Sequence, residues 1–176
     1  FNLKIQLDKC LFFQKEVKLL GHIVSDTGIR IDPTKISKVK DIPYPKNIAQ
    51  LQTFLGLMTY FRRYIPNFAD IAAPLYGILK GKEVHQKNRV PSKQNSLKFS
   101  LSEEQIKAAE ILKEAVINSP VLRYPDFTKP FIVTCDASGK GLGAVLEQEF
   151  EDGEHPIAFA SRQLKGAELN YGNTDR

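Results

Sequence analysis

The chain has 176 residues, of which 42% are hydrophobic, enough to bury a core in one ordinary domain or two small ones. Its 25 Lys and Arg residues exceed its 20 Asp and Glu residues, and the net charge of +5 fits a polyanionic partner and an ordinary basic surface equally well. Two distant cysteines, Cys10 and Cys135, argue against a disulfide framework or a zinc site, and no apolar run reaches the roughly 18 residues of a membrane span, so we expect a reduced, intracellular protein without a membrane partner.

The first 32 residues predict a small antiparallel unit. We expect strands over 11–13, 17–24 and 29–31, because apolar and β-branched residues gather there. Asp26, Thr27 and Gly28 supply turn chemistry between the last two strands. Such a unit is too short to be stable alone, which predicts that it forms the edge of something larger.

Helices are predicted next. Asp32 as N-cap and Pro33 at the first helical position begin a short helix that ends before "PYP". The clearest helix spans 47–65, where Asn47 and Gln50 fit a capping box. Its apolar residues recur at helical spacing: Leu51, Phe54, Leu55, Met58, Phe61 and Ile65. Pro66 ends it, and a helix over 71–79 is expected to pack back against it.

The second half of the chain begins with a polar segment and a helix, and the spacing of its apolar residues becomes strand-like in the final third. Residues 81–98 are polar and basic, which predicts a linker. Ser102 and Gln105 then fit a capping box at the start of a further helix. Three strands in meander order are predicted after it, over 131–136, 141–149 and 156–164.

Asp136 closes the apolar stretch "FIVTCD", which suits a central strand buried on both faces. A carboxylate at that place needs a partner, and a metal ion, a basic side chain or a turn cap would each satisfy it. On this stretch alone a cap is favoured, since Asp before Ala-Ser-Gly commonly closes a hairpin. Hydrolysis of a phosphodiester by two divalent cations needs several carboxylates that converge on one point. The sequence places one carboxylate there, that of Asp136.

"DASGKGLGAVLEQ", followed by "HPIAFASRQLKGAELNYG", resembles the opening of the ribonuclease H domain of gypsy-type LTR retrotransposon reverse transcriptases. "DKCLFF", "LLGHIVSDTGIRIDP", "LQTFLGLMTYFRRYIPNFADIAAPL" and "SPVLRYPDFTKPF" are similar to the same polyprotein in the same order. The resemblance implies an α+β fold in four parts. These are the end of the palm with its primer grip (1–32), a helical thumb (33–80), a basic linker (81–98), and a connecting helix with the three-stranded start of an incomplete ribonuclease H-like domain (99–176).

The resemblance also implies nucleic-acid contacts. "LLGH" resembles the primer grip, with Leu20, Gly21 and His22 at the primer end, and 47–65 resembles the thumb helix that follows the minor groove. One face of that helix carries Gln52, Gly56 and Tyr60. A glycine there costs about 0.5–1 kcal/mol relative to alanine, and either an approaching nucleic-acid backbone or tight packing on the next helix explains it. Arg62 and Arg63 would neutralise phosphates or stabilise the negative end of the helix dipole.

For the ribonuclease H site, the resemblance implies that Asp136 is the first Mg²⁺-binding carboxylate, with Ser138 on a turn close to the nucleic acid and Arg162 in a structural role. The chain stops before the position of the family's next acid, and the polymerase acids would precede Phe1. Leu101 stands where the family has tryptophan, after a longer loop, which weighs against the usual packing between thumb and ribonuclease H.

We therefore expect a fragment of an RNA-directed DNA polymerase with ribonuclease H activity. It should grip a template–primer duplex or RNA–DNA hybrid, work with the remainder of the Pol polyprotein, and be inactive as an isolated piece. The alternative is a non-catalytic nucleic-acid-binding module derived from a retroelement.

Overall fold

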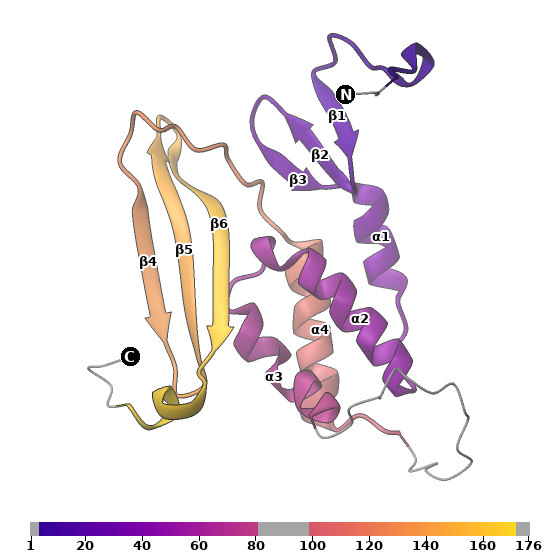
Figure 1. The fold of residues 1–176 in the computed structure, drawn as a ribbon, viewed down its shortest axis with the longest axis vertical. Coiled ribbons are helices and arrows are strands. Elements are labelled where there is room, and N and C mark those ends of the chain that lie inside the picture. Colours follow the sequence, from indigo (N-terminus) through magenta and orange to yellow (C-terminus); the bar gives the residue numbers. More distant parts are fainter. Residues whose placement is uncertain (1–3, 81–98, 172–176) are drawn as a thin grey trace.

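The computed structural model describes residues 4–80 and 99–171 of the chain, which form helices and two three-stranded antiparallel sheets (Figure 1). In chain order the elements are η1 (Leu7–Lys9), β1 (Glu16–Leu19), β2 (His22–Ser25), β3 (Ile29–Ile31), α1 (Pro33–Asp41), α2 (Ile48–Tyr60), η2 (Arg62–Tyr64), α3 (Phe68–Leu79), α4 (Glu103–Ile117), β4 (Ile132–Ala137), β5 (Gly141–Phe150), β6 (Gly153–Gln163) and η3 (Gly166–Asn170). The predicted α+β class is confirmed. The predicted linker lies outside the described residues.

The first sheet has the order β1-β2-β3, and its first turn was missed by the sequence prediction. A single strand over 17–24 is wrong, because the chain reverses at Leu20 and Gly21, whose φ angles are +48° and +80°. Two residues with positive φ match the twist of a tight hairpin, although a leucine rarely takes the first place. The strand expected over 11–13 is also wrong, since that segment pairs with no strand of the described chain. The turn before β3 is as predicted.

Local hydrogen bonds begin the helices where the sequence predicts. The Asp32 carboxylate accepts from the Thr34 amide at 2.9 Å, and the Asn47 side chain accepts from the Gln50 amide at 2.8 Å. The Gln50 side chain accepts from the Lys46 amide, one residue before the predicted partner. The capping box of α4 is confirmed.

The helix expected over 47–65 is shorter than predicted. It ends at Tyr60, and the 3-10 turn η2 replaces its last turn. Ile65 precedes Pro66 and has φ −111° and ψ 111°, because the proline ring disfavours helical geometry in the residue before it. The next helix, α3, begins at Phe68 and accommodates Pro74 in its interior.

One hydrophobic core joins the four α-helices, and α4 packs against the other three. Its largest fully buried side chains include Leu51, Met58, Tyr64, Leu75 and Leu112. Leu101, in the place of the family's tryptophan, packs against this core. The core therefore belongs mainly to the helices, with Ile31 and Leu122 added from either side.

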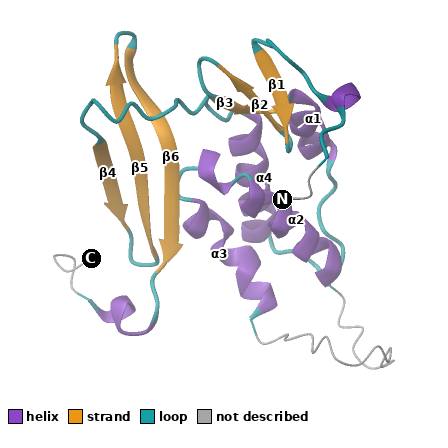
Figure 2. Ribbon diagram, turned by 45° about the horizontal axis from the view of Figure 1, so that its top comes forward, coloured by secondary structure: helices purple, strands orange, loops and turns teal. Residues whose placement is uncertain are grey.

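The second sheet has the order β4-β5-β6 and lies with β6 toward α3 (Figures 1 and 2). Asp136 pairs with Gly143, which pairs with Ser161, so these three residues form one row across the sheet. The prediction of a central, doubly buried strand ending at Asp136 is wrong for this chain. Within the described residues β4 pairs only with β5, and Val133 is 61% exposed.

Candidate nucleic-acid interface and carboxylate site

The tip of the β1–β2 hairpin lies against the end of α2. The Tyr60 hydroxyl donates to the Leu20 carbonyl and lies 3.3 Å from His22 Nδ1. A side chain at Gly21 would approach the Lys35 chain to 3.3 Å. Four residues predicted separately as primer grip and thumb are thus brought together: Leu20, Gly21, His22 and Tyr60.

An aromatic cluster holds His22 in place. Its ring stacks on Tyr64 with centroids 5.7 Å apart and lies 5.3 Å from the Tyr60 ring. Burial, with a smaller contribution from the Arg63 charge, lowers the pKa of His22 despite opposing backbone hydrogen bonds. Burial raises the pKa of Tyr64 to about 12. Both groups are therefore neutral near pH 7, and the cluster works by ring packing and hydrogen bonding.

The predicted face of α2 is open to solvent. Gln52, Gly56 and Tyr60 are all exposed, and Leu20 at the adjoining hairpin tip is 81% exposed. A Cβ atom placed on Gly56 would meet nothing within 4 Å, so tight packing on another described helix does not explain this glycine. The open space beside Gly56 leaves room for another backbone to approach the helix from outside.

The two arginines lie beyond the end of α2, in η2, and they differ. Arg62 donates to the Ser161 carbonyl at 2.8 Å and so connects η2 to β6. Arg63 is exposed, with its guanidinium carbon 6.0 Å from the centre of the Tyr64 ring. Both arginines follow the C-cap Phe61 directly, so their charges also lie near the negative end of the α2 dipole. Arg63 is the freer of the two for a phosphate.

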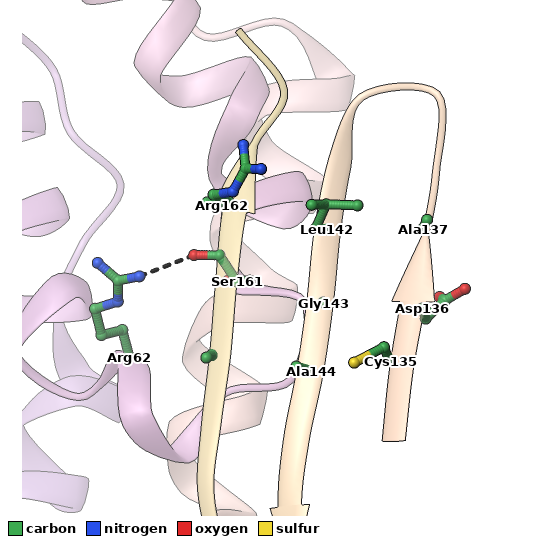
Figure 3. A pocket seen from close by; sticks show the side chains of 10 residues that line it. Arg62, Cys135, Asp136, Ala137, Leu142, Gly143, Ala144, Ser161 and Arg162 are labelled. Carbon is green, nitrogen blue, oxygen red and sulfur yellow. Dashed lines mark hydrogen bonds between the residues drawn. The ribbon is translucent and has the colours of Figure 1, made fainter. Parts of the chain in front are cut away.

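Asp136 lies near the end of β4 beside a cavity of about 590 Å³ that Arg62 and Arg162 also line (Figure 3). Figure 3 shows its carboxylate directed away from Arg62, two strands from Ser161. Within 4–80 and 99–171 this carboxylate has no hydrogen-bond or ion-pair partner. An exposed, unpaired carboxylate suits a hard divalent cation as one ligand.

The turn cap expected of Asp136 is made by Ser138. Its hydroxyl accepts from the amides of Lys140 and Gly141 at 3.1 and 2.9 Å. The same hydroxyl lies 2.7 Å from Asp70 Oδ2 on α3, to which it donates. Asp136 is therefore not the cap, because a hydroxyl two residues later has already satisfied the turn.

No complete cation site is present among the described residues. Across 4–80 and 99–171, no three His, Cys, Asp or Glu side chains gather as metal ligands. Asp136 fits one position of such a site, and two cations need further carboxylates. Arg162, assigned a structural role, forms a paired contact with Glu168 at 2.6 and 2.9 Å and holds the Glu168 pKa at about 2.

Sequence reasoning missed several residues that build these places. Tyr64 supports His22, Asp70 receives Ser138, and Ser161 receives Arg62. The two hydrogen bonds join residues 68 and 99 positions apart, so no local pattern could have identified them. One local signal was available in the sequence. Pro66 disfavours helical geometry at Ile65, which indicates that the chain changes direction before α3.

The proteins that this chain resembles in sequence and in fold are reverse transcriptases and retroelement polyproteins. Residues 101–176 match the family model described as the RNase H-like domain found in reverse transcriptase. The foamy viral protease-reverse transcriptase in complex with RNA/DNA hybrid has a TM-score of 0.72 at 25% identity, covering 96% of this chain and 21% of that chain. The same enzyme in complex with dsDNA has a TM-score of 0.71 at 25% identity, covering 92% of this chain and 31% of that chain.

Curated relatives are retroelement polyproteins. The chain is 43% identical over 175 residues to the retrovirus-related Pol polyprotein from transposon 297 of Drosophila melanogaster, covering 99% of this chain and 15% of that protein. The gypsy polyprotein of the same species is 38% identical over 180 residues, covering 99% of this chain and 16% of that protein. The Tf2-3 polyprotein of Schizosaccharomyces pombe is 32% identical over 176 residues, covering 99% of this chain and 12% of that protein.

The resemblance to gypsy-type retrotransposon Pol polyproteins is thus confirmed along the chain, which spans about one seventh of its Drosophila relatives' length. None of the described helices is long and apolar enough to cross a membrane.

Proposed function

We propose that this region grips a template–primer duplex or RNA–DNA hybrid as part of an RNA-directed DNA polymerase with ribonuclease H activity. The contact between Tyr60 and the Leu20–His22 tip carries the proposal, because it joins two predicted binding segments into one exposed surface. The +5 net charge is consistent with it. Reverse transcriptases bound to dsDNA and to RNA/DNA hybrid are among the similar structures.

The exposed face of α2 would lie along the duplex. Gly56 leaves the helix backbone bare at its middle, so a sugar-phosphate chain can approach where a side chain would hold it off. Gln52 and Tyr60 flank it one turn away on either side. The Gln52 amide offers hydrogen bonds, and the Tyr60 ring, held by the Leu20 carbonyl, offers a flat surface. Arg63 would add a charge beyond the helix end.

Asp136 would hold Mg²⁺ together with carboxylates from the remainder of the Pol polyprotein. Bound Mg²⁺ supplies Lewis acidity at the scissile phosphate of the RNA strand. Asp136 contributes a negative charge on a regular strand, so its position is fixed by the backbone ladder to β5. The unpaired Cys10 and Cys135 support the further proposal of a reducing, intracellular setting.

Duplex binding by this chain tests the first part. We expect Gly56→Leu to weaken binding of an RNA–DNA hybrid by about tenfold in a fluorescence titration at low salt, because its side chain blocks a contact worth roughly 1.4 kcal/mol. Gly56→Ala is the matched control for helix propensity, and it should bind better than Gly56→Leu. Equal binding by wild type and Gly56→Leu, with both chains folded, would remove α2 from the interface.

Cleavage by a longer polyprotein tests the second part. We expect Asp136→Asn to abolish cutting of the RNA strand while DNA synthesis continues, since one cation would lose its charged ligand. Undiminished cutting by the variant would remove Asp136 from the metal site. Hybrid binding without any cutting by the wild-type polyprotein would favour the non-catalytic binding module.

A further inference from the structure

The junction between η2–α3 and the second sheet is built from hydrogen bonds centred on Ser161. The Ser161 hydroxyl accepts from the Ala69 amide at 2.9 Å, and its carbonyl accepts from Arg62 at 2.8 Å. The Gln163 side chain donates to the Ala69 carbonyl at 3.4 Å. Ser138 adds its bond to Asp70 from the neighbouring turn. The start of α3 is thus fixed to two adjacent elements of the sheet.

Two glycines of "GLG" make this close approach possible. A Cβ atom on Gly141 would lie 2.1 Å from Asp70 Oδ1, and one on Gly143 would lie 1.9 Å from Asn67 Oδ1. At Gly141 the Arg162 carbonyl, 3.0 Å away, also restricts a side chain. The side chains of Asp70 in α3 and of Asn67, the N-cap residue of α3, therefore lie directly on the bare backbone of β5.

The same row of the sheet ends at the proposed catalytic carboxylate. Ser161 pairs with Gly143, and Gly143 pairs with Asp136. Because neighbouring strands lie about 4.8 Å apart, the Cα atoms of Ser161 and Asp136 are separated by roughly 10 Å along a backbone-bonded row. On the other side, Arg62 follows the exposed face of α2 by two residues.

Docking also leaves a polar atom without a partner. Asp70 Oδ1 is buried and accepts no hydrogen bond within the described part of the chain. Burying this oxygen without a hydrogen bond costs free energy when α3 packs on the second sheet. The four hydrogen bonds at the junction have to offset that cost. An apolar residue at position 70 would avoid this cost but would lose the bond to Ser138.

We propose that Ser161 and Asp70 are positioning residues that set the distance between the duplex held on α2 and the carboxylate of Asp136. This inference rests on the proposed function. A fixed junction makes Asp136 meet the RNA strand at a constant distance from the primer end. A loosened junction lets that distance vary while Asp136 itself stays intact.

The junction is tested first on this chain by amide hydrogen exchange. Ser161→Ala removes the hydroxyl that receives the Ala69 amide, and we expect that amide to exchange about tenfold faster. Ser161→Thr keeps a hydroxyl and should restore protection. Ser100→Ala is the matched control, because Ser100 is exposed and distant in sequence from the junction. Unchanged exchange at Ala69 in Ser161→Ala would overturn the junction.

The positioning role is tested in the longer polyprotein by mapping RNA cuts on a hybrid with a recessed DNA primer. We expect one dominant cut distance in the wild type, Ser161→Thr and Ser100→Ala. In Ser161→Ala and Asp70→Leu the cuts should spread over several neighbouring positions, while the total rate on a hybrid without a primer end changes less than about twofold.

The two possible failures are distinguishable. A Ser161→Ala polyprotein that cuts at the wild-type distance, with Ala69 deprotected, would overturn the positioning role alone. A wild-type polyprotein that neither binds nor cuts the hybrid would overturn the proposed function and the positioning role with it, whatever the exchange result.

Discussion

The two three-stranded sheets meet the helices in different ways. The first has strands of three and four residues, and the Tyr60 hydroxyl and the His22 ring connect it to α2 and η2. The second has strands of up to 11 residues. The Ser161 hydroxyl accepts from the Ala69 amide of α3, and the Ser161 carbonyl accepts from the Arg62 side chain of η2. The first contact leaves the hairpin tip exposed. At the second contact, the polar groups of Arg62, Ser138 and Ser161 are hydrogen-bonded within the chain.

This difference separates residues that are free for a partner from residues that hold the chain together. Leu20, Gly56 and Arg63 remain exposed around the first contact. Ser138 and Arg62, which the family resemblance assigns to nucleic acid, already have partners in α3 and β6. Their assignment to nucleic acid stays a prediction, and any binding by them has to compete with these bonds.

The largest expected effect concerns Gly28, where the first sheet meets the segment leading to the second. Gly28 has φ +143°, and a Cβ atom there would lie 2.2 Å from the Leu122 carbonyl. Leu122 and Ile29 exchange both backbone hydrogen bonds at this point. We expect Gly28→Ala to lower the free energy of unfolding by about 2–5 kcal/mol, from backbone strain and overpacking together. Urea denaturation measures it.

Gly153→Ala is the control that isolates strain. Gly153 has φ +116°, but a Cβ atom there meets nothing within 4 Å. Its cost should be only the strain, about 1–2 kcal/mol. Equal losses for the two variants would mean that crowding against the Leu122 carbonyl adds nothing to the cost of a side chain at Gly28.

A smaller effect is expected at the exposed contact. Tyr60→Phe removes the hydroxyl bonded to the Leu20 carbonyl, and we expect a loss of about 1 kcal/mol in unfolding free energy together with weaker hybrid binding. Tyr44→Phe is the matched control, because the Tyr44 hydroxyl donates to Glu110 at 2.6 Å elsewhere on the surface. If both variants bind the hybrid equally well, the Tyr60 contact serves stability alone.

The smallest effect is the pH dependence of the His22 cluster. Its pKa is lowered below 6.5 in the folded chain, so the unfolded chain binds more protons below that pH. Stability from this group is therefore present above about pH 6.5 and is lost as the pH falls through the lower folded value. Urea denaturation at pH 7.5 and 5.5 should show a smaller acid loss in His22→Gln than in wild type. An equal loss would assign the effect to other groups.

Interactions between near neighbours could be predicted from the sequence. Asp32, Asn47 and Ser102 cap their helices as expected, because each accepts from an amide two or three residues away. The meander of β4, β5 and β6 was also predicted, since its turns carry their own signals. The exposed α2 face followed from helical spacing.

The amino-acid sequence was therefore sufficient to predict most helices and turns, and the chain order of the motifs that it shares with its relatives. Two contacts became visible in the folded chain alone: the hairpin tip meets Tyr60, across 40 residues, and α3 lies on the glycines of β5. These contacts escaped prediction because their partners are far apart along the chain. A cap or a turn is satisfied within a few residues, whereas a contact such as Ala69 with Ser161, 92 residues apart, forms only when the packed core brings both ends together.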